Sequence, residues 1–414
     1  MVKSSNQVSP ADESAPGGSL PEIIFGEASA RLIAERDGVD VTSYRLPPRP
    51  SVRTPLRLIV WLIQGIFGVV SLVLLLAVIA AVPFMNFLAL GYLLEGQARV
   101  ARTGRLRDAF LLLDVAPRIG SIALGVWFWL LPLRLIASAR EDQRVIRDGE
   151  PGSLEFLAPV LAVVIGTHLC LALARGGSLS CFFRPVRNGR WLWQRWRKAD
   201  YLAHATAGVQ DFLHRLRLKH HFLLGVKGFA GAFLWLVIPS ALFVAGRPNG
   251  GGRNILIAVG GVMLMFVLSW VPFLQARFAV TGRWKTMFEL RTIRQLYQRA
   301  PLAWLVATAV VYVLSLPLYL PKIYLLPRDA MWVMTLIFIV TIYPARVVTG
   351  WALYRAARRE TQPWFGFRWL SRAILFAMLG LYVFLLFFTP LIAEHGRAAV
   401  FEHHSVLLPI PAGL

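Results

Sequence analysis

The stretch LIVWLIQGIFGVVSLVLLLAVIAAVPFMNFLALGYLL, residues 58–94, contains no Asp, Glu, Lys or Arg. A helix needs about 20 mainly apolar residues to cross about 30 Å of hydrocarbon. At 1.5 Å per residue this stretch would form a helix about 55 Å long, which exceeds the bilayer. Pro83 lies inside it, and a proline removes a backbone donor and kinks a helix. We therefore expect residues 58–82 to form the first span and 83–94 to form a kinked extension or a re-entrant piece buried in protein.

The composition of the 414-residue chain points to the same class of protein. Apolar residues make up 57% and charged residues 16%, and the mean hydropathy is +0.58. A soluble domain is usually about 45–50% apolar and about 25% charged. Two cysteines cannot form a disulfide framework. The composition excludes an ordinary soluble domain and a largely disordered chain, and it indicates a multi-pass membrane protein.

Seven further stretches are free of Asp, Glu, Lys and Arg, at 119–133, 156–174, 228–246, 254–276, 300–321, 330–345 and 373–393. The stretches ending at 133 and 345 continue past Arg134 and Arg346, whose side chains are expected to reach the headgroups. Lipid offers no partners to open backbone groups, so the spans should be helices. The prediction is an all-α integral membrane protein with about eight transmembrane helices. Residues 1–55 would be a disordered or linker tail, 56–393 the membrane domain, and 394–414 a short non-cytoplasmic tail.

The basic residues predict the orientation. The loops after odd-numbered spans carry 27 Lys and Arg, against 8 in the other loops and the C-terminal tail together. Cytoplasmic loops are enriched in these residues, so the odd loops should face the cytoplasm. Eight spans would place the N-terminus on the opposite side, although Arg45, Arg49, Arg53 and Arg57 precede the first span. Either the first stretch is a hairpin or the tail is translocated against its charge.

Two of the basic loops share a sequence. Gln97-Ala98-Arg99 with Thr103-Gly104-Arg105 recurs 178 residues later as Gln275-Ala276-Arg277 with Thr281-Gly282-Arg283, and weaker copies occupy 184–190 and 345–350. This pattern favours four repeated helical hairpins, each with a basic turn, an amphipathic stretch and a proline-ended span. Gly104 and Gly282 are expected to take positive φ and end a helix.

The amphipathic stretches 190–219 and 283–299 combine apolar residues at helical spacing with cations. Both are expected to lie in the membrane interface, where their cations would meet anionic headgroups. The same charge pattern could bind nucleic acid, but the orientation rule already accounts for it, so no nucleic-acid partner is predicted. The candidate anionic-lipid contacts are Arg99, Arg102, Arg105, Arg187, Arg190, Arg277 and Arg283.

Motifs of catalysis or metal binding are missing from the sequence. Neither HExxH nor a pair of CxxC motifs occurs, and no carboxylate falls near the middle of a predicted span. The prediction therefore contains no catalytic residue, no metal site and no cofactor. A membrane enzyme would require distant polar residues to converge, such as His168 with Glu95. A candidate cytoplasm-facing pocket is assigned to Asn86, Tyr92 and Glu95, with a kinked end of the span as the alternative.

The motif Pro83-x-x-Asn86-Phe87-x-x-x-Gly91-Tyr92-Leu93 resembles the repeat of the bacterial membrane proteins of domain-of-unknown-function family 4013. The resemblance covers about 50 residues, and the sequence departs from the family at residues 104–108, where the family has a Leu-Pro-x-Trp loop. It implies a polytopic protein of the bacterial inner membrane and no particular activity.

Three functions remain open at this point. The first is a non-enzymatic protein that binds anionic lipid or organises a membrane complex. The second is a transporter or permease component for a small or lipid-like substrate, and the third is a membrane-embedded enzyme. The basic interfacial stretches favour the first.

Overall fold

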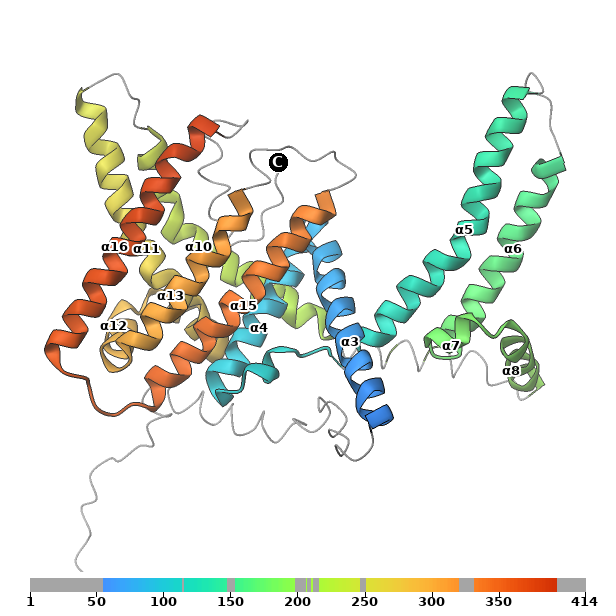
Figure 1. Ribbon diagram of the computed structural model, residues 1–414, viewed down its shortest axis with the longest axis horizontal. Coiled ribbons are helices and arrows are strands. Elements are labelled where there is room, and N and C mark those ends of the chain that lie inside the picture. Colours follow the sequence, from blue (N-terminus) through green and yellow to red (C-terminus); the bar gives the residue numbers. More distant parts are fainter. Residues whose placement is uncertain are drawn as a thin grey trace, which may run out of the picture.

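The computed structural model describes residues 55–113, 115–146, 153–197, 206, 210, 216–245, 251–319 and 331–392, and no strand occurs among them. Eight helices within these residues are long and apolar enough to cross a membrane, which confirms the predicted all-α membrane class. They are α3 (Pro55–Ala81), α5 (Ala116–Ile146), α6 (Ser153–Ala174), α10 (Leu218–Ala245), α11 (Gly251–Thr281), α13 (Pro301–Ser315), α15 (Met331–Arg358) and α16 (Phe365–Ile392) (Figure 1). The predicted tails lie outside the described residues, apart from Pro55.

The first apolar stretch is a helical hairpin. Helix α3 ends at Ala81, the chain turns at Phe84 with a φ of 65°, and α4 (Asn86–Thr103) runs back through the bundle. The Thr335 hydroxyl of α15 bonds the Ala77 carbonyl near the end of α3, whereas Gly104, just after α4, lies beside Tyr354 of α15. Helix α4 therefore returns over the same length of α15 that α3 has covered. This geometry decides between the kinked span and the hairpin.

Helix α4 is the central helix of the bundle, and this explains its composition. Fourteen of its 18 residues are buried, so its outer surface is covered by protein rather than lipid. A helix in that position can carry Glu95, Gln97 and other polar residues, because neighbouring helices supply the partners that lipid cannot. Hydropathy alone misses α4 for this reason.

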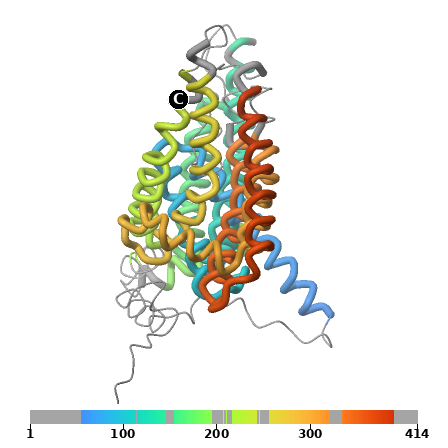
Figure 2. The backbone as a smooth tube through the Cα atoms, turned by 90° about the vertical axis from the view of Figure 1, so that its left-hand side faces the viewer, coloured from blue at the N-terminus to red at the C-terminus, as the bar shows by residue number. Residues whose placement is uncertain are grey.

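Several basic segments lie at the same end of the bundle, because successive long helices run in alternating directions. Pro55 of α3, the 3₁₀ helices η2 (Leu106–Ala109) and η3 (Trp284–Phe288), the helices α7 (Leu179–Phe182) and α8 (Pro185–Arg197), and α12 (Leu290–Arg299) lie at this end (Figures 1 and 2). We call it the basic end. With α3 and α4 forming a hairpin, Arg57 joins the other cations there, so the translocation of the tail against its charge is not required.

The two strongest repeat copies share a turn. Gly104 and Gly282 have φ of 72° and 69°, and each is followed by an extended arginine, Arg105 or Arg283, and then by a 3₁₀ helix. The turns predicted in the other two copies are wrong. Residues 185–190 lie within α8, and Gly350 lies inside α15, which continues to Arg358. The four-hairpin repeat stays a prediction.

The two amphipathic stretches behave differently. Helix α12 turns its apolar side chains Ile293, Leu296 and Tyr297 into the protein, where each is at most 1% exposed, so the prediction that this face lies in the interface is wrong. Helix α8 begins at Pro185, and most of residues 198–217 lie outside the described residues. A unit of α5, α6, α7 and α8 stands beside the main bundle in Figure 1, with Gly120 of α5 packed on Ser71 of α3.

Candidate functional site

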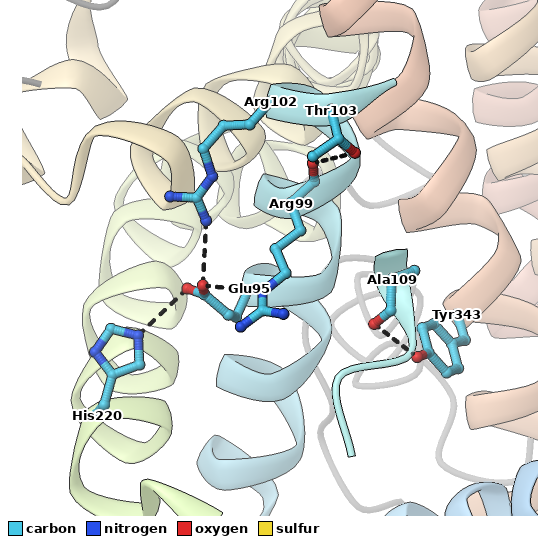
Figure 3. Close-up of polar contacts among 7 residues, drawn as sticks. All are labelled: Glu95, Arg99, Arg102, Thr103, Ala109, His220 and Tyr343. Carbon is cyan, nitrogen blue, oxygen red and sulfur yellow. Dashed lines mark hydrogen bonds and ion pairs between the residues drawn. The ribbon is translucent and has the colours of Figure 1, made fainter. Parts of the chain in front are cut away.

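Glu95 is the centre of a charged cluster on α4. Its carboxylate is almost completely buried and accepts a hydrogen bond from Arg102 at 3.1 Å, with Arg99 at 3.9 Å on the same helix (Figure 3). The Nε2 atom of His220, near the start of α10, lies 3.3 Å from the other carboxylate oxygen. Both carboxylate oxygens of Glu95 are therefore engaged, one by an arginine of α4 and the other by the imidazole of His220. The contact with His220 joins α10 to α4.

A second polar cluster joins three helices. Nη1 of Arg346 on α15 donates to Oε1 of Gln97 on α4 and to Oε1 of Gln275 on α11, both at 3.2 Å. The two amide groups are used on their other side as well, because Gln97 donates to the Pro272 carbonyl at 3.4 Å and Gln275 to the Gly228 carbonyl at 3.1 Å. All three side chains are at least 95% buried. We call them the Gln-Arg-Gln lock.

The lock corrects the prediction for Arg346. Its side chain was expected to reach the headgroups, but it points into the bundle and is 5% exposed. Gln97 and Gln275 are six residues from the ends of α4 and α11, so the lock lies about 9 Å inside those helix ends. The sequence did carry a signal for it, since both glutamines occupy the same position in the repeated Gln-Ala-Arg motif.

The predicted pocket residues have separate partners. The Tyr92 hydroxyl lies 3.2 Å from that of Tyr343, which donates to the Ala109 carbonyl at 3.1 Å. Asn86 is buried near the start of α4, about 9 Å before Tyr92 along the helix. Tyr92 and Glu95 are one turn apart, so the structure places the three residues along one buried helix.

The seven predicted lipid contacts divide into two groups. Arg105, Arg187, Arg190 and Arg283 are exposed at the basic end. Arg99 and Arg102 turn toward Glu95, and the buried Arg277 forms an ion pair with Glu289. The second group is engaged by carboxylates of the protein, which leaves the four exposed arginines as the ones that can meet a headgroup.

No family model, curated protein or solved structure matches this chain.

The described side chains do not bring the suggested enzyme pair together. His168 bonds the Phe182 carbonyl at 2.9 Å through Nε2 and packs on Trp129, within the α5–α8 unit. Glu95 is in the central helix, and the histidine beside its carboxylate is His220 rather than His168. Among the described residues, no group of three or more His, Cys, Asp or Glu could hold a metal ion. The polar core thus combines ion pairs with amide hydrogen bonds, and both kinds of contact stabilise the bundle.

Proposed function

We propose that this chain is a non-enzymatic multi-pass protein of the bacterial plasma membrane that binds anionic lipid through its basic end, which faces the cytoplasm. Binding of lipid would let it organise other membrane components at that leaflet. The relation to domain-of-unknown-function family 4013 belongs to the same proposal.

One observation supports it above the others. The exposed arginines at the basic end stand beside exposed apolar side chains, including Leu106 at 51%, Trp284 at 43% and Phe288 at 44% exposed. Arg105 precedes Leu106, and Arg283 precedes Trp284. Tryptophan is enriched at the headgroup level, and each basic residue near an anionic leaflet contributes about 1 kcal/mol. This pairing is the chemistry of a surface that meets phospholipid headgroups.

The packing of α4 favours this proposal over a transporter. A path for a substrate along the central helix would need space between α4 and its neighbours. The Gln97 carbonyl lies so close to Gly350 that a β-carbon there would collide with it, and the His221 carbonyl lies as close to Gly91. Helix α4 is therefore in backbone contact with both α15 and α10.

Thermal unfolding of the detergent-purified full-length protein tests the proposal. A ligand that binds only the folded state stabilises it by about 2.7 kcal/mol at 100 times its Kd. We expect added phosphatidylglycerol to raise the melting temperature by several degrees more than phosphatidylcholine does. An equal effect of the two lipids would contradict the proposal.

A further inference from the structure

Helix α8 exposes apolar and basic side chains together. Val186 is 80% exposed and Trp193 is 62% exposed, while Arg187 and Arg190 are also exposed. Val186 and Trp193 are seven residues apart, so they share one line along the helix, and Arg187 and Arg190 share the neighbouring face. An apolar stripe beside a basic stripe is the pattern of a helix that lies in a membrane interface.

Helix α12 provides the contrast at the same end of the molecule. It also carries two exposed arginines, Arg291 and Arg294, but Ile293, Leu296 and Tyr297 are buried in the protein, and Leu290 at its first position is 38% exposed. Its arginines therefore have charge without an exposed apolar stripe. Both helices are amphipathic in sequence, and the packing distinguishes them.

The position of α8 is fixed by buried hydrogen bonds. Asn188 is fully buried, donates to the Cys181 carbonyl at 2.8 Å and accepts from Arg175 at 2.9 Å. The Phe182 carbonyl of α7 lies 2.9 Å from both Trp129 Nε1 and His168 Nε2. These bonds attach α7 and α8 to α5 and α6, beside which they lie in Figure 1, and they leave Val186 and Trp193 exposed.

The segment that contains α7 and α8 carries charge of one sign. Residues 175–197 contain six arginines and no Asp or Glu. An anion that approaches the exposed face therefore meets no carboxylate from this segment, and the planar guanidinium groups suit phosphate oxygens.

We infer that α8 is the main anionic-phospholipid site of the protein, with Arg187 and Arg190 binding the headgroup phosphate and Val186 and Trp193 entering the apolar boundary. This site rests on the proposed lipid-binding function and assigns it to one helix. A free phosphate ion would engage the arginines alone, whereas a phospholipid would also use the apolar stripe.

The test measures binding of fluorescent short-chain phosphatidylglycerol to the full-length protein in detergent. Each arginine near an anionic surface is worth about a 5-fold change in affinity, so R187Q/R190Q should weaken binding about 25-fold. V186S/W193S should weaken it as well, although it keeps the charge. The matched control, R291Q/R294Q, loses the same charge from α12 and should stay within about 2-fold of wild type. All variants change exposed residues, and their melting temperatures check that they are folded.

The outcomes separate the site from the function. If wild type prefers phosphatidylglycerol to phosphatidylcholine but R187Q/R190Q binds like wild type, the α8 site is wrong and the proposed function survives. If wild type has no preference, the proposed function fails too. Equal loss of binding in the α8 and α12 variants would mean diffuse charge rather than a site. Displacement of the lipid by equimolar inorganic phosphate, with no effect of V186S/W193S, would identify a small-anion site instead.

Discussion

At the scale of single residues, the ionisable and amide side chains in the bundle hold helices together. Arg346 would be costly as an isolated buried charge, and its bonds to Gln97 and Gln275 place it between three helices. Glu95 likewise lies between two arginines of its own helix and His220 of the next. A buried polar group without partners lowers the free energy of unfolding, so the loss of one member of either cluster should destabilise the protein strongly.

Arg346→Met should lower the stability of the protein by about 1–3 kcal/mol, because it leaves the oxygens of Gln97 and Gln275 without a donor. The melting temperature in detergent measures the change, and R105M, which alters an exposed arginine, should have little effect. The triple variant R346M/Q97M/Q275M should lose less stability than the three single changes together. Strict additivity would show that the lock is not one unit.

At the scale of elements, glycine sets how closely the helices approach. The backbones of α4 and α10 cross at Gly91 and Gly225, where a β-carbon on either residue would overlap a carbonyl group of the other helix. Small residues permit such crossings in membrane bundles, where close packing is a main source of helix association. The crossing brings His220 to Glu95 and thereby completes the charged cluster.

Gly91→Ala should destabilise the bundle by about 1–3 kcal/mol or prevent its folding, because overpacking displaces the backbone. Gly166→Ala is the matched control, since a β-carbon there meets nothing within 4 Å and alanine favours a helix by up to about 1 kcal/mol. Folded yield and melting temperature should therefore both fall in G91A, whereas neither should fall in G166A. Similar melting temperatures of G91A and G166A would contradict the close approach of α4 and α10 at Gly91.

At the scale of the whole molecule, the α3–α4 hairpin decides the topology. Eight apolar helices alone would put both termini on one side. The return of α4 adds a crossing, so Pro55 lies at the basic end while α16 runs toward the other end. The described basic turns and helices named above then lie at a single end, in agreement with the positive-inside rule.

Cysteine accessibility in intact cells tests this topology. In a variant without Cys170 and Cys181, a membrane-impermeant maleimide should label F84C, because the turn between α3 and α4 lies opposite the basic end. R105C and R283C should be labelled only after the cells are permeabilised. Labelling of F84C and R105C from the same side would contradict the hairpin.

The amino-acid sequence by itself determined the membrane class, the eight apolar helices and the clustering of cations in alternate loops. These properties depend on local composition, because the bilayer selects length and apolarity one segment at a time. The positive φ at Gly104 and Gly282 was also local, since the turn needs a residue without a β-carbon.

The tertiary structure decided what packs beside each segment. It made α4 a buried central helix although its hydropathy is low, and it turned Arg346 into the bundle although the sequence predicts that its side chain reaches the headgroups. It also buried Ile293, Leu296 and Tyr297 of α12 and left Val186 and Trp193 of α8 exposed, although both helices are amphipathic. The physical reason is that neighbouring helices bury each side chain and supply its hydrogen-bond partners, and a local sequence pattern does not show which helices will pack together.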